Sequence, residues 1–128
     1  MRILMDTHVL LWALGGSDRL SRAAAATIQD ADNDLLFSAA TIWEVAIKAS
    51  LGKTGFGVSP ATIHAQALAT GFVEVPVRSE AGLRAGALPL HHRDPFDRLL
   101  VAQAELERAT LYTADRQLLA YGPHVELI

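Results

Sequence analysis

Four acidic residues of this sequence could together form a metal-dependent site for phosphate chemistry: Asp6, Glu44, Asp97 and Asp115. Each lies where a short apolar run gives way to a helical pattern, or in the first turns of that helix. Carboxylates that converge without partners repel each other, so they stay partly protonated or destabilise the fold. A divalent cation removes this conflict, and oxygen ligands suit Mg²⁺ or Mn²⁺ better than zinc. Such a cation lowers the pKa of a bound water and stabilises charge on a phosphate during in-line attack.

Each acid also has a purely structural interpretation. Asp6 could cap the helix that follows it, and Asp115 could cap a later helical turn, because Asp is a favoured N-cap residue. Asp94 before Pro95 is a third possible cap. It would leave Asp97 in the first turn of the helix, where the helix dipole favours a negative charge.

Glu44 could likewise form a capping box with Thr41, or an ion pair with Lys48 four residues later. A solvated cap has no reason to lie inside an apolar run, however. Glu44 lies within "TIWEVAI", and Asp97 precedes an apolar stripe that begins at Leu100. We therefore favour one shared site over separate caps. The two are compatible, because helix N-termini attract anionic groups.

Strand-like runs and helical patterns alternate along the chain. We expect strands at 2–5, 34–38, 72–77, 110–113 and 124–128, and helices at 7–14, 22–31, 39–52, 60–70, 80–87, 94–109 and, as one or two turns, 115–122. Pro76 restricts its strand to an edge or an end. The alternation predicts a parallel sheet covered on both faces. In such folds ligands bind outside the carboxyl ends of the strands.

Composition limits the class of protein. The chain has 128 residues, of which 51% are hydrophobic and 20% charged, which suits one globular domain. It contains no cysteine, so disulfides and thiolate metal sites are excluded. The net charge of −3 argues against a surface coated with basic residues for duplex DNA. The apolar N-terminus has neither the length of a membrane span nor a cleavage site, so we expect a cytoplasmic protein without membrane association.

Four blocks resemble, in order, the acidic signatures of PIN-domain ribonucleases, and more closely VapC-type toxins of bacterial toxin–antitoxin pairs. They are "ILMDTHVLLWAL", "FSAATIWEVAIK", "HHRDPFDRLLVAQA" and "LYTADRQL". The ordered set is specific and spans nearly the whole chain. The resemblance implies one PIN-like nuclease domain over residues 1–128, with a three-layer α/β/α fold around a mostly parallel sheet. It also implies an Mg²⁺- or Mn²⁺-dependent endoribonuclease, a hydrolase in which a metal-activated water attacks a phosphodiester.

The resemblance also assigns residues and partners. Asp6, Glu44, Asp97 and Asp115 match the acids of the family, as catalytic residues and metal ligands; we expect Asp6 and Asp97 to contact the metal most directly. Asp94 is expected to be a cap. Small hydroxyl residues near the carboxylates are expected at Thr7, Ser38 and Thr113. The implied partners are RNA, a second copy of the chain in a homodimer, and a cognate antitoxin whose C-terminal segment masks the site.

Several cations near the acids are candidates for holding RNA: Arg98, Arg116, Lys48, Arg93 and Lys53, with the pair His91–His92 beside them. For the arginines we favour a solvated helix face or an ion pair such as Asp94–Arg98. For the two histidines we favour a loop or hydrogen-bonding role over metal ligation. Trp12 and Trp43 are interpreted as core residues, with an exposed groove for a partner peptide as the alternative.

Other functions remain as alternatives. An aspartyl-nucleophile phosphatase needs an Asp-x-Asp pair after the first strand, but the text here is "MDTHV". A receiver-type domain needs a late lysine, and none follows Lys53. A metal-dependent nuclease acting on DNA stays possible, because acids and metal do not distinguish the sugars. A non-catalytic dimerising scaffold, with all the acids as caps, is the third alternative.

Overall fold

A parallel β-sheet forms the centre of the computed structural model, which describes residues 1–52, 57 and 59–128. The strands are β1 (Arg2–Met5), β2 (Asp34–Ser38), β3 (Val73–Val75), β4 (Thr110–Thr113) and β5 (Val125–Leu127). They lie in the order β3-β2-β1-β4-β5, and each neighbouring pair is parallel. The predicted parallel sheet is therefore confirmed.

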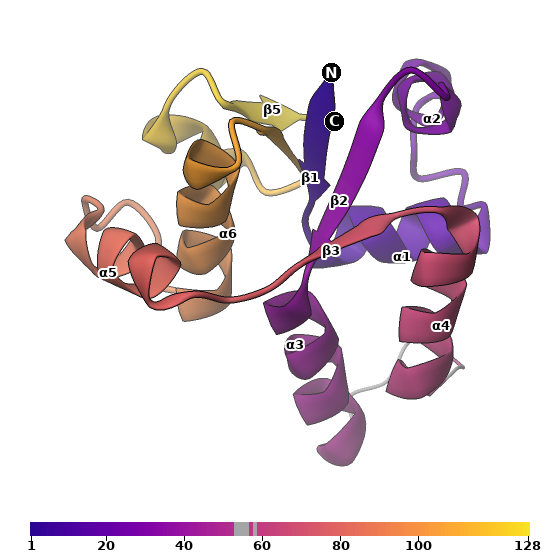
Figure 1. The fold of residues 1–128 in the computed structure, drawn as a ribbon, viewed down its shortest axis with the longest axis horizontal. Helices are drawn as coiled ribbons and strands as arrows, with labels where there is room; N and C mark the ends of the chain where they lie inside the picture. Colours follow the sequence, from indigo (N-terminus) through magenta and orange to yellow (C-terminus); the bar gives the residue numbers. More distant parts are fainter. Residues whose placement is uncertain (53–56, 58) are drawn as a thin grey trace.

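Helices cover both faces of this sheet (Figure 1). On one face lie α1 (Thr7–Gly15), α2 (Arg22–Gln29) and α4 (Pro60–Thr70). On the other lie α5 (Ser79–Ala87), α6 (Pro95–Leu106) and the short 3₁₀ helix η1 (Arg116–Tyr121). Helix α3 (Ala39–Ser50) extends from the carboxyl end of β2. This is the three-layer α/β/α arrangement that the sequence predicts.

The central strand explains why the apolar runs are continuous. Ile3, Leu4 and Met5 of β1 are all 0% exposed. Successive side chains of a strand point to opposite faces, and Leu4 packs in one apolar cluster while Ile3 and Met5 pack in the other. A strand covered on both faces has no solvent side, so it needs apolar residues at every position.

Some element ends differ from the prediction for local reasons. Strand β3 stops at Val75, before Pro76, and lies at the edge of the sheet as expected. Helix α6 ends at Leu106 and not at residue 109, and Arg108 has a φ of 52°, which a right-handed helix excludes. None of the described helices is both long and apolar enough to span a membrane.

The order of the strands determines where a site can form. The chain builds the sheet outward from β1 in both directions, through β2 to β3 and through β4 to β5. At such a reversal the connections leave toward opposite faces, and a crevice opens beyond the carboxyl ends of the two central strands. Asp6 directly follows β1, and Asp115 comes two residues after β4.

Candidate functional site

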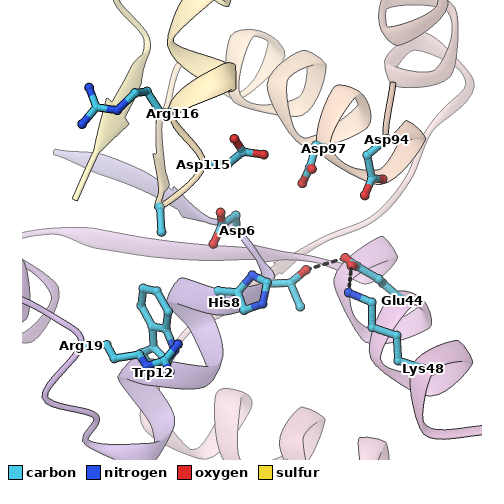
Figure 2. Close-up of a pocket in the computed structure, with 12 residues that line it drawn as sticks. Asp6, His8, Trp12, Arg19, Glu44, Lys48, Asp94, Asp97, Asp115 and Arg116 are labelled. Carbon is cyan, nitrogen blue, oxygen red and sulfur yellow. Dashed lines mark hydrogen bonds and ion pairs between the residues drawn. The ribbon is translucent and has the colours of Figure 1, made fainter. Parts of the chain in front are cut away.

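One pocket of about 450 Å³ brings the four predicted acids together. Asp6, Glu44, Asp97 and Asp115 all line it, and Asp94 lies at its edge (Figure 2). Asp6 and Asp115 follow β1 and β4 and lie at the crevice between these strands. The other two come from helices α3 and α6, which begin beside that crevice. The four acids therefore line one pocket, and their roles as catalytic residues and metal ligands remain predictions.

Asp6 is both a helix cap and part of the pocket wall. Its Oδ1 accepts a hydrogen bond from the backbone N–H of Val9 at 2.9 Å, which caps α1. Its Oδ2 accepts from the Thr113 hydroxyl at 2.6 Å. The residue is only 5% exposed, and burial raises the pKa of Asp6 above its ordinary value despite these donors. The capping and pocket interpretations of Asp6 therefore both hold.

Glu44 is fully partnered. Its Oε1 accepts from the Thr7 hydroxyl at 2.6 Å, and its Oε2 pairs with Lys48 Nζ at 2.7 Å (Figure 2). The predicted ion pair with Lys48 is confirmed. The capping box with Thr41 is wrong, because Ser38 caps α3 by accepting from Ala40 N at 3.0 Å.

The expected hydroxyl partners are correct for two of the three positions. Thr7 and Thr113 both donate to site carboxylates. Ser38 is engaged in capping α3, and its hydroxyl makes no hydrogen bond to an acid among the described residues. A serine that directly ends a strand before a helix is well placed for N-capping.

Asp97 is the site acid whose negative charge is least stabilised by neighbouring donors and cations. It lies in the first turn of α6, after the cap Asp94, whose carboxylate accepts from Phe96 N at 2.8 Å. Burial and the neighbouring Asp94 carboxylate raise the pKa of Asp97 to about 7, with smaller contributions from Asp6 and Glu44. Asp97 therefore titrates near neutral pH and not in the usual range of an aspartate.

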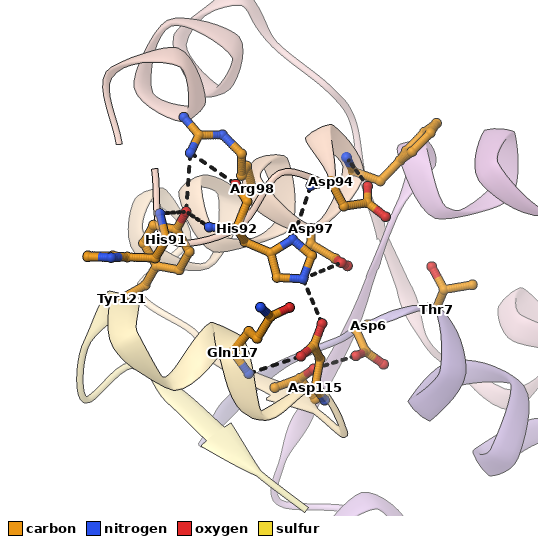
Figure 3. A network of polar contacts seen from close by, with 12 residues as sticks. Asp6, Thr7, His91, His92, Asp94, Asp97, Arg98, Asp115, Gln117 and Tyr121 are labelled. Atoms are coloured by element: carbon orange, nitrogen blue, oxygen red, sulfur yellow. Dashed lines mark hydrogen bonds and ion pairs between the residues drawn. The ribbon is translucent and has the colours of Figure 1, made fainter. Parts of the chain in front are cut away.

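His92 is a site residue that the sequence did not identify as such. Its Nε2 lies 2.7 Å from Asp115 Oδ2 and 3.5 Å from Asp97 Oδ2 (Figure 3). The backbone N–H of Asp94 donates to its Nδ1 at 3.1 Å. Because Nδ1 accepts, Nε2 carries the proton and donates to the Asp115 carboxylate, while the Asp97 carboxylate lies farther away. The expected hydrogen-bonding role of His92 is confirmed.

A network behind His92 fixes the loop that carries it. The Tyr121 hydroxyl accepts from the backbone N–H groups of His91 and His92 at 3.2 and 3.1 Å, and it donates to Pro89 O at 2.8 Å (Figure 3). The ring of His91 packs edge-on against Tyr121, 5.1 Å between centroids. His92 is thus held from both its backbone and its ring.

The cations near the acids have different surroundings. The Arg98 guanidinium donates to the carbonyl oxygens of Ala85, Leu88 and Pro89, so it stabilises a loop and is not available to a substrate. The alternative ion pair of Arg98 with Asp94 is absent from the described residues. Arg19 and Arg116 are exposed and line the pocket. Arg93 does not line it, and Lys53 lies outside the described residues.

The two tryptophans occupy different surfaces. Trp12 is half-buried in the wall of the acidic pocket. Trp43 is 64% exposed, so its interpretation as a core residue is wrong. Its ring packs against Phe96, with 5.4 Å between centroids, in an apolar groove between α3 and α6. Each of these two aromatic residues directly precedes a site acid in the sequence.

The donor set of the pocket fits a hard divalent cation. Ligand atoms of Asp97, Asp115 and His92 all lie within 4.8 Å of one another. Since the Nε2–H of His92 faces the carboxylates, the atoms free to hold a cation here are oxygens, which Mg²⁺ and Mn²⁺ prefer. Positive charge at this point would also offset the burial and the neighbouring acids that raise the pKa of Asp97.

Comparisons with known proteins agree with this geometry. The PIN domain family matches residues 3–122. Ribonuclease VapC22 of Mycobacterium tuberculosis is 33% identical over 117 residues, which cover 91% of this chain and 88% of that protein. A toxin–antitoxin complex from Klebsiella pneumoniae has a similar fold, with a TM-score of 0.66, 24% identity and coverage of 97% of this chain and 95% of that one. VapBC2 from Rickettsia felis, solved with a DNA fragment from its promoter, also has a similar fold. Its TM-score is 0.68 at 14% identity, and the match covers 100% of this chain and 98% of that one.

Replacing Asp97 by Asn should stabilise the metal-free protein at high pH. The pKa of Asp97 is about 7 in the fold against an ordinary 3.8, so between these values only the folded state binds the proton. The stability of the wild type therefore falls as pH rises through this window. In EDTA, Asp97→Asn should melt several degrees above the wild type at pH 8 and close to it at pH 4. Asp32→Asn, an exposed control, should follow the wild type; equal pH profiles for all three would contradict the raised pKa.

Removing the His92 ring should weaken divalent-cation binding. His92 holds the Asp115 and Asp97 carboxylates, and the loss of such an outer partner typically lowers metal affinity by about 10- to 100-fold. The measurement is the melting midpoint against Mn²⁺ concentration, since a ligand that binds only the folded state raises it. His92→Ala should need correspondingly more Mn²⁺. The matched control is His91→Ala, whose ring faces Tyr121 and not the acids. Equal Mn²⁺ affinity for both variants would rule out this role.

Proposed function

This chain belongs to the PIN-domain family, and from that premise we propose that it is the endoribonuclease toxin of a VapC-type toxin–antitoxin pair. The observation that carries the proposal is the convergence of four carboxylates in one pocket, where burial and a neighbouring acid raise the pKa of Asp97 to about 7. The identity of 33% to a ribonuclease over most of the chain supports RNA as the substrate. An enzyme of this kind would act in the cytoplasm, where cellular RNA is translated.

The raised pKa also distinguishes this proposal from a non-catalytic scaffold. Asp6, Asp94 and Asp115 each cap a helix, as a scaffold would require. Asp97 caps nothing, and a solvated residue in a first helical turn would have its charge favoured by the helix dipole. Its raised pKa instead indicates an enforced approach of like charges in a buried place.

We assign metal binding to Asp6, Glu44, Asp97 and Asp115, with Asp6 and Asp97 in the most direct contact. A divalent cation, Mg²⁺ or Mn²⁺, would supply a water nucleophile at neutral pH and neutralise charge on the scissile phosphate. The chain itself contributes orientation. Asp6 is fixed by Val9 N–H and the Thr113 hydroxyl, and Glu44 by Thr7 and Lys48. His92 fixes Asp115 in the same way.

We further propose that the chain forms homodimers and binds an antitoxin that masks the pocket. The solved structures of similar fold include toxin–antitoxin complexes, which motivates the partner. On this chain the apolar groove of Trp43, Phe96, Val77 and Leu99 supports it. Trp43 and Phe96 directly precede Glu44 and Asp97, so a peptide anchored in the groove would lie beside the acids.

RNA cleavage by the purified chain tests the enzymatic proposal. The wild type should cut RNA with Mg²⁺ or Mn²⁺ and stop in EDTA. Asp97→Asn should reduce the rate about 100-fold or more, the usual effect of losing a group that stabilises transition-state charge. Asp32→Asn makes the same chemical change at an exposed turn and should leave the rate intact. Cutting of DNA but not RNA would reassign the substrate. Undiminished cleavage by Asp97→Asn would show that the active site lies elsewhere.

Co-expression with the product of a short neighbouring gene tests the partner. The complex should copurify, and the partner should suppress RNA cleavage. Trp43→Ala should raise the partner concentration needed for inhibition by about 30-fold or more, as expected for a buried aromatic anchor. Leu83→Ala, at an even more exposed apolar residue on α5, is the control. Identical inhibition of both variants would place the partner outside the groove.

A further inference from the structure

We propose that the pocket wall opposite α6, with Trp12 at its centre, is a subsite for one unpaired base of a single-stranded RNA. Trp12 would stack on the base, and Arg19 and Arg116 would contact the phosphates on either side of it. This inference rests on the proposed ribonuclease function and specifies the form of its substrate. The experiments below separate the failure of one from the failure of the other.

The pocket has two chemically distinct walls. Glu44 and Asp97 line one end, and Trp12 with Arg19 lines the other (Figure 2). The Arg19 Cζ lies 5.8 Å from the centroid of the Trp12 ring, and the ring of His8 lies 5.9 Å from it at 42°. An aromatic ring with a cation beside it in a groove is an arrangement by which proteins bind single strands.

Trp12 is not required to fill the core. The buried residues of α1 are Thr7, Val9 and Leu10. Trp12 belongs to neither of the two apolar clusters that cover the sheet, although Ala13 and Leu14 of the same helix pack against one of them. The residue is half-buried and lines the acidic pocket, and it also lines a second cavity with Leu20 and Phe72. A large ring left partly exposed beside a polar cavity indicates a contact surface for a ligand.

The charges at this wall suit a phosphate backbone. Arg19 and Arg116 are both exposed, and neither forms an ion pair within the described part of the chain. Lys48, at the acidic wall, is already paired with Glu44 at 2.7 Å. The net charge of −3 and the four acids would repel RNA, so attraction has to come from local cations at the entrance. The two arginines that form no ion pair in the described structure provide it.

Stacking on Trp12 requires that the base be unpaired. In a duplex each base face is covered by its neighbours, whereas unstacked bases in single strands expose their faces to aromatic side chains. Stacking tolerates every base, because each has a π-face. The pocket of about 450 Å³ falls in the range of roughly 300–1,000 Å³ for small-ligand sites. The structure therefore predicts a preference for single strands with weak base specificity at this subsite.

Tryptophan fluorescence provides a readout that does not depend on cleavage. In a Trp43→Phe background Trp12 is the only tryptophan, because the chain has two. Adding Asp97→Asn prevents turnover, so an RNA octamer of mixed sequence can be titrated with Mg²⁺ present. We expect saturable quenching by the single-stranded octamer and far less by a duplex of the same sequence. Saturable binding in a filter assay without any change in Trp12 fluorescence would overturn the subsite.

Steady-state cleavage of the same octamer gives the second readout, with Asp97 intact and Trp43→Phe as the reference. Trp12→Leu should raise KM by about 5- to 100-fold, the range for loss of one base–aromatic stack. Trp12→Phe keeps an aromatic ring and should recover most of the affinity. The kcat should change little, since no hydrogen bond joins Trp12 to an acid in the described structure. If the Trp12→Leu protein has the same melting midpoint and the same KM as the Trp43→Phe reference, stacking on Trp12 is excluded.

Salt dependence tests the arginine at this wall. Arg19→Gln should reduce the slope of log Kd against log salt by about 0.7, the value for one phosphate contact to a single strand. The control is Arg22→Gln, three residues later at the start of α2 and outside the pocket. Equal slopes for the two would remove Arg19 from the subsite. If the wild type cuts no RNA, the proposed function itself fails; if it cuts RNA while Trp12 is inert, only the subsite is wrong.

Discussion

The repulsion among buried carboxylates is the interaction on which this site depends. The strand order brings residues from four elements to the crevice beyond β1 and β4, and nothing in the fold separates their charges. Each acid except one has strong donors: Asp6 has Val9 N–H and Thr113, Glu44 has Thr7 and Lys48, and Asp115 has Gln117 N–H and His92. Asp97 has only the distant Nε2 of His92. Burial and the neighbouring Asp94 carboxylate therefore act on Asp97 with little compensation, and they raise its pKa to about 7.

Helix capping and site formation use the same carboxylates for a physical reason. A helix that begins at the carboxyl end of a parallel strand directs its first N–H groups toward the crevice. Asp6 and Asp115 cap the helices that follow β1 and β4, and each keeps one oxygen away from the capping N–H. Capping thus uses one oxygen of each side chain, while the second oxygen contacts another segment, Thr113 for Asp6 and His92 for Asp115. Asp6 and Asp115 are therefore helix caps and pocket-lining residues at the same time.

The predictable part of the structure depends on patterns that are local in the sequence. The alternation of apolar runs such as "RILM" with helical spacing was enough to predict the parallel sheet. The acids at the strand ends were enough to predict where the pocket lies. Features that depend on contacts between distant residues could not be predicted from the sequence. The direction of Arg98 depends on carbonyl groups of the preceding loop, and the position of His92 depends on Tyr121, which is 29 residues away. Ser38 and Thr41 are both good N-caps, and only the end of β2 decides between them.

The hydrogen bonds of the site also divide it into a fixed part and an adaptable part. Thr113 ties β4 to the residue after β1, Thr7 ties α1 to α3, and Tyr121 ties η1 to the loop before α6. Every element that carries an acid is therefore joined to another element through a side chain, so the carboxylates keep their places before any ligand arrives. Arg19 and Arg116 are exposed and form no ion pairs in the described structure. The fold therefore fixes the acids through hydrogen bonds, and it leaves the guanidinium groups of the two pocket-lining arginines without hydrogen bonds in the described structure, as the proposed RNA subsite would need.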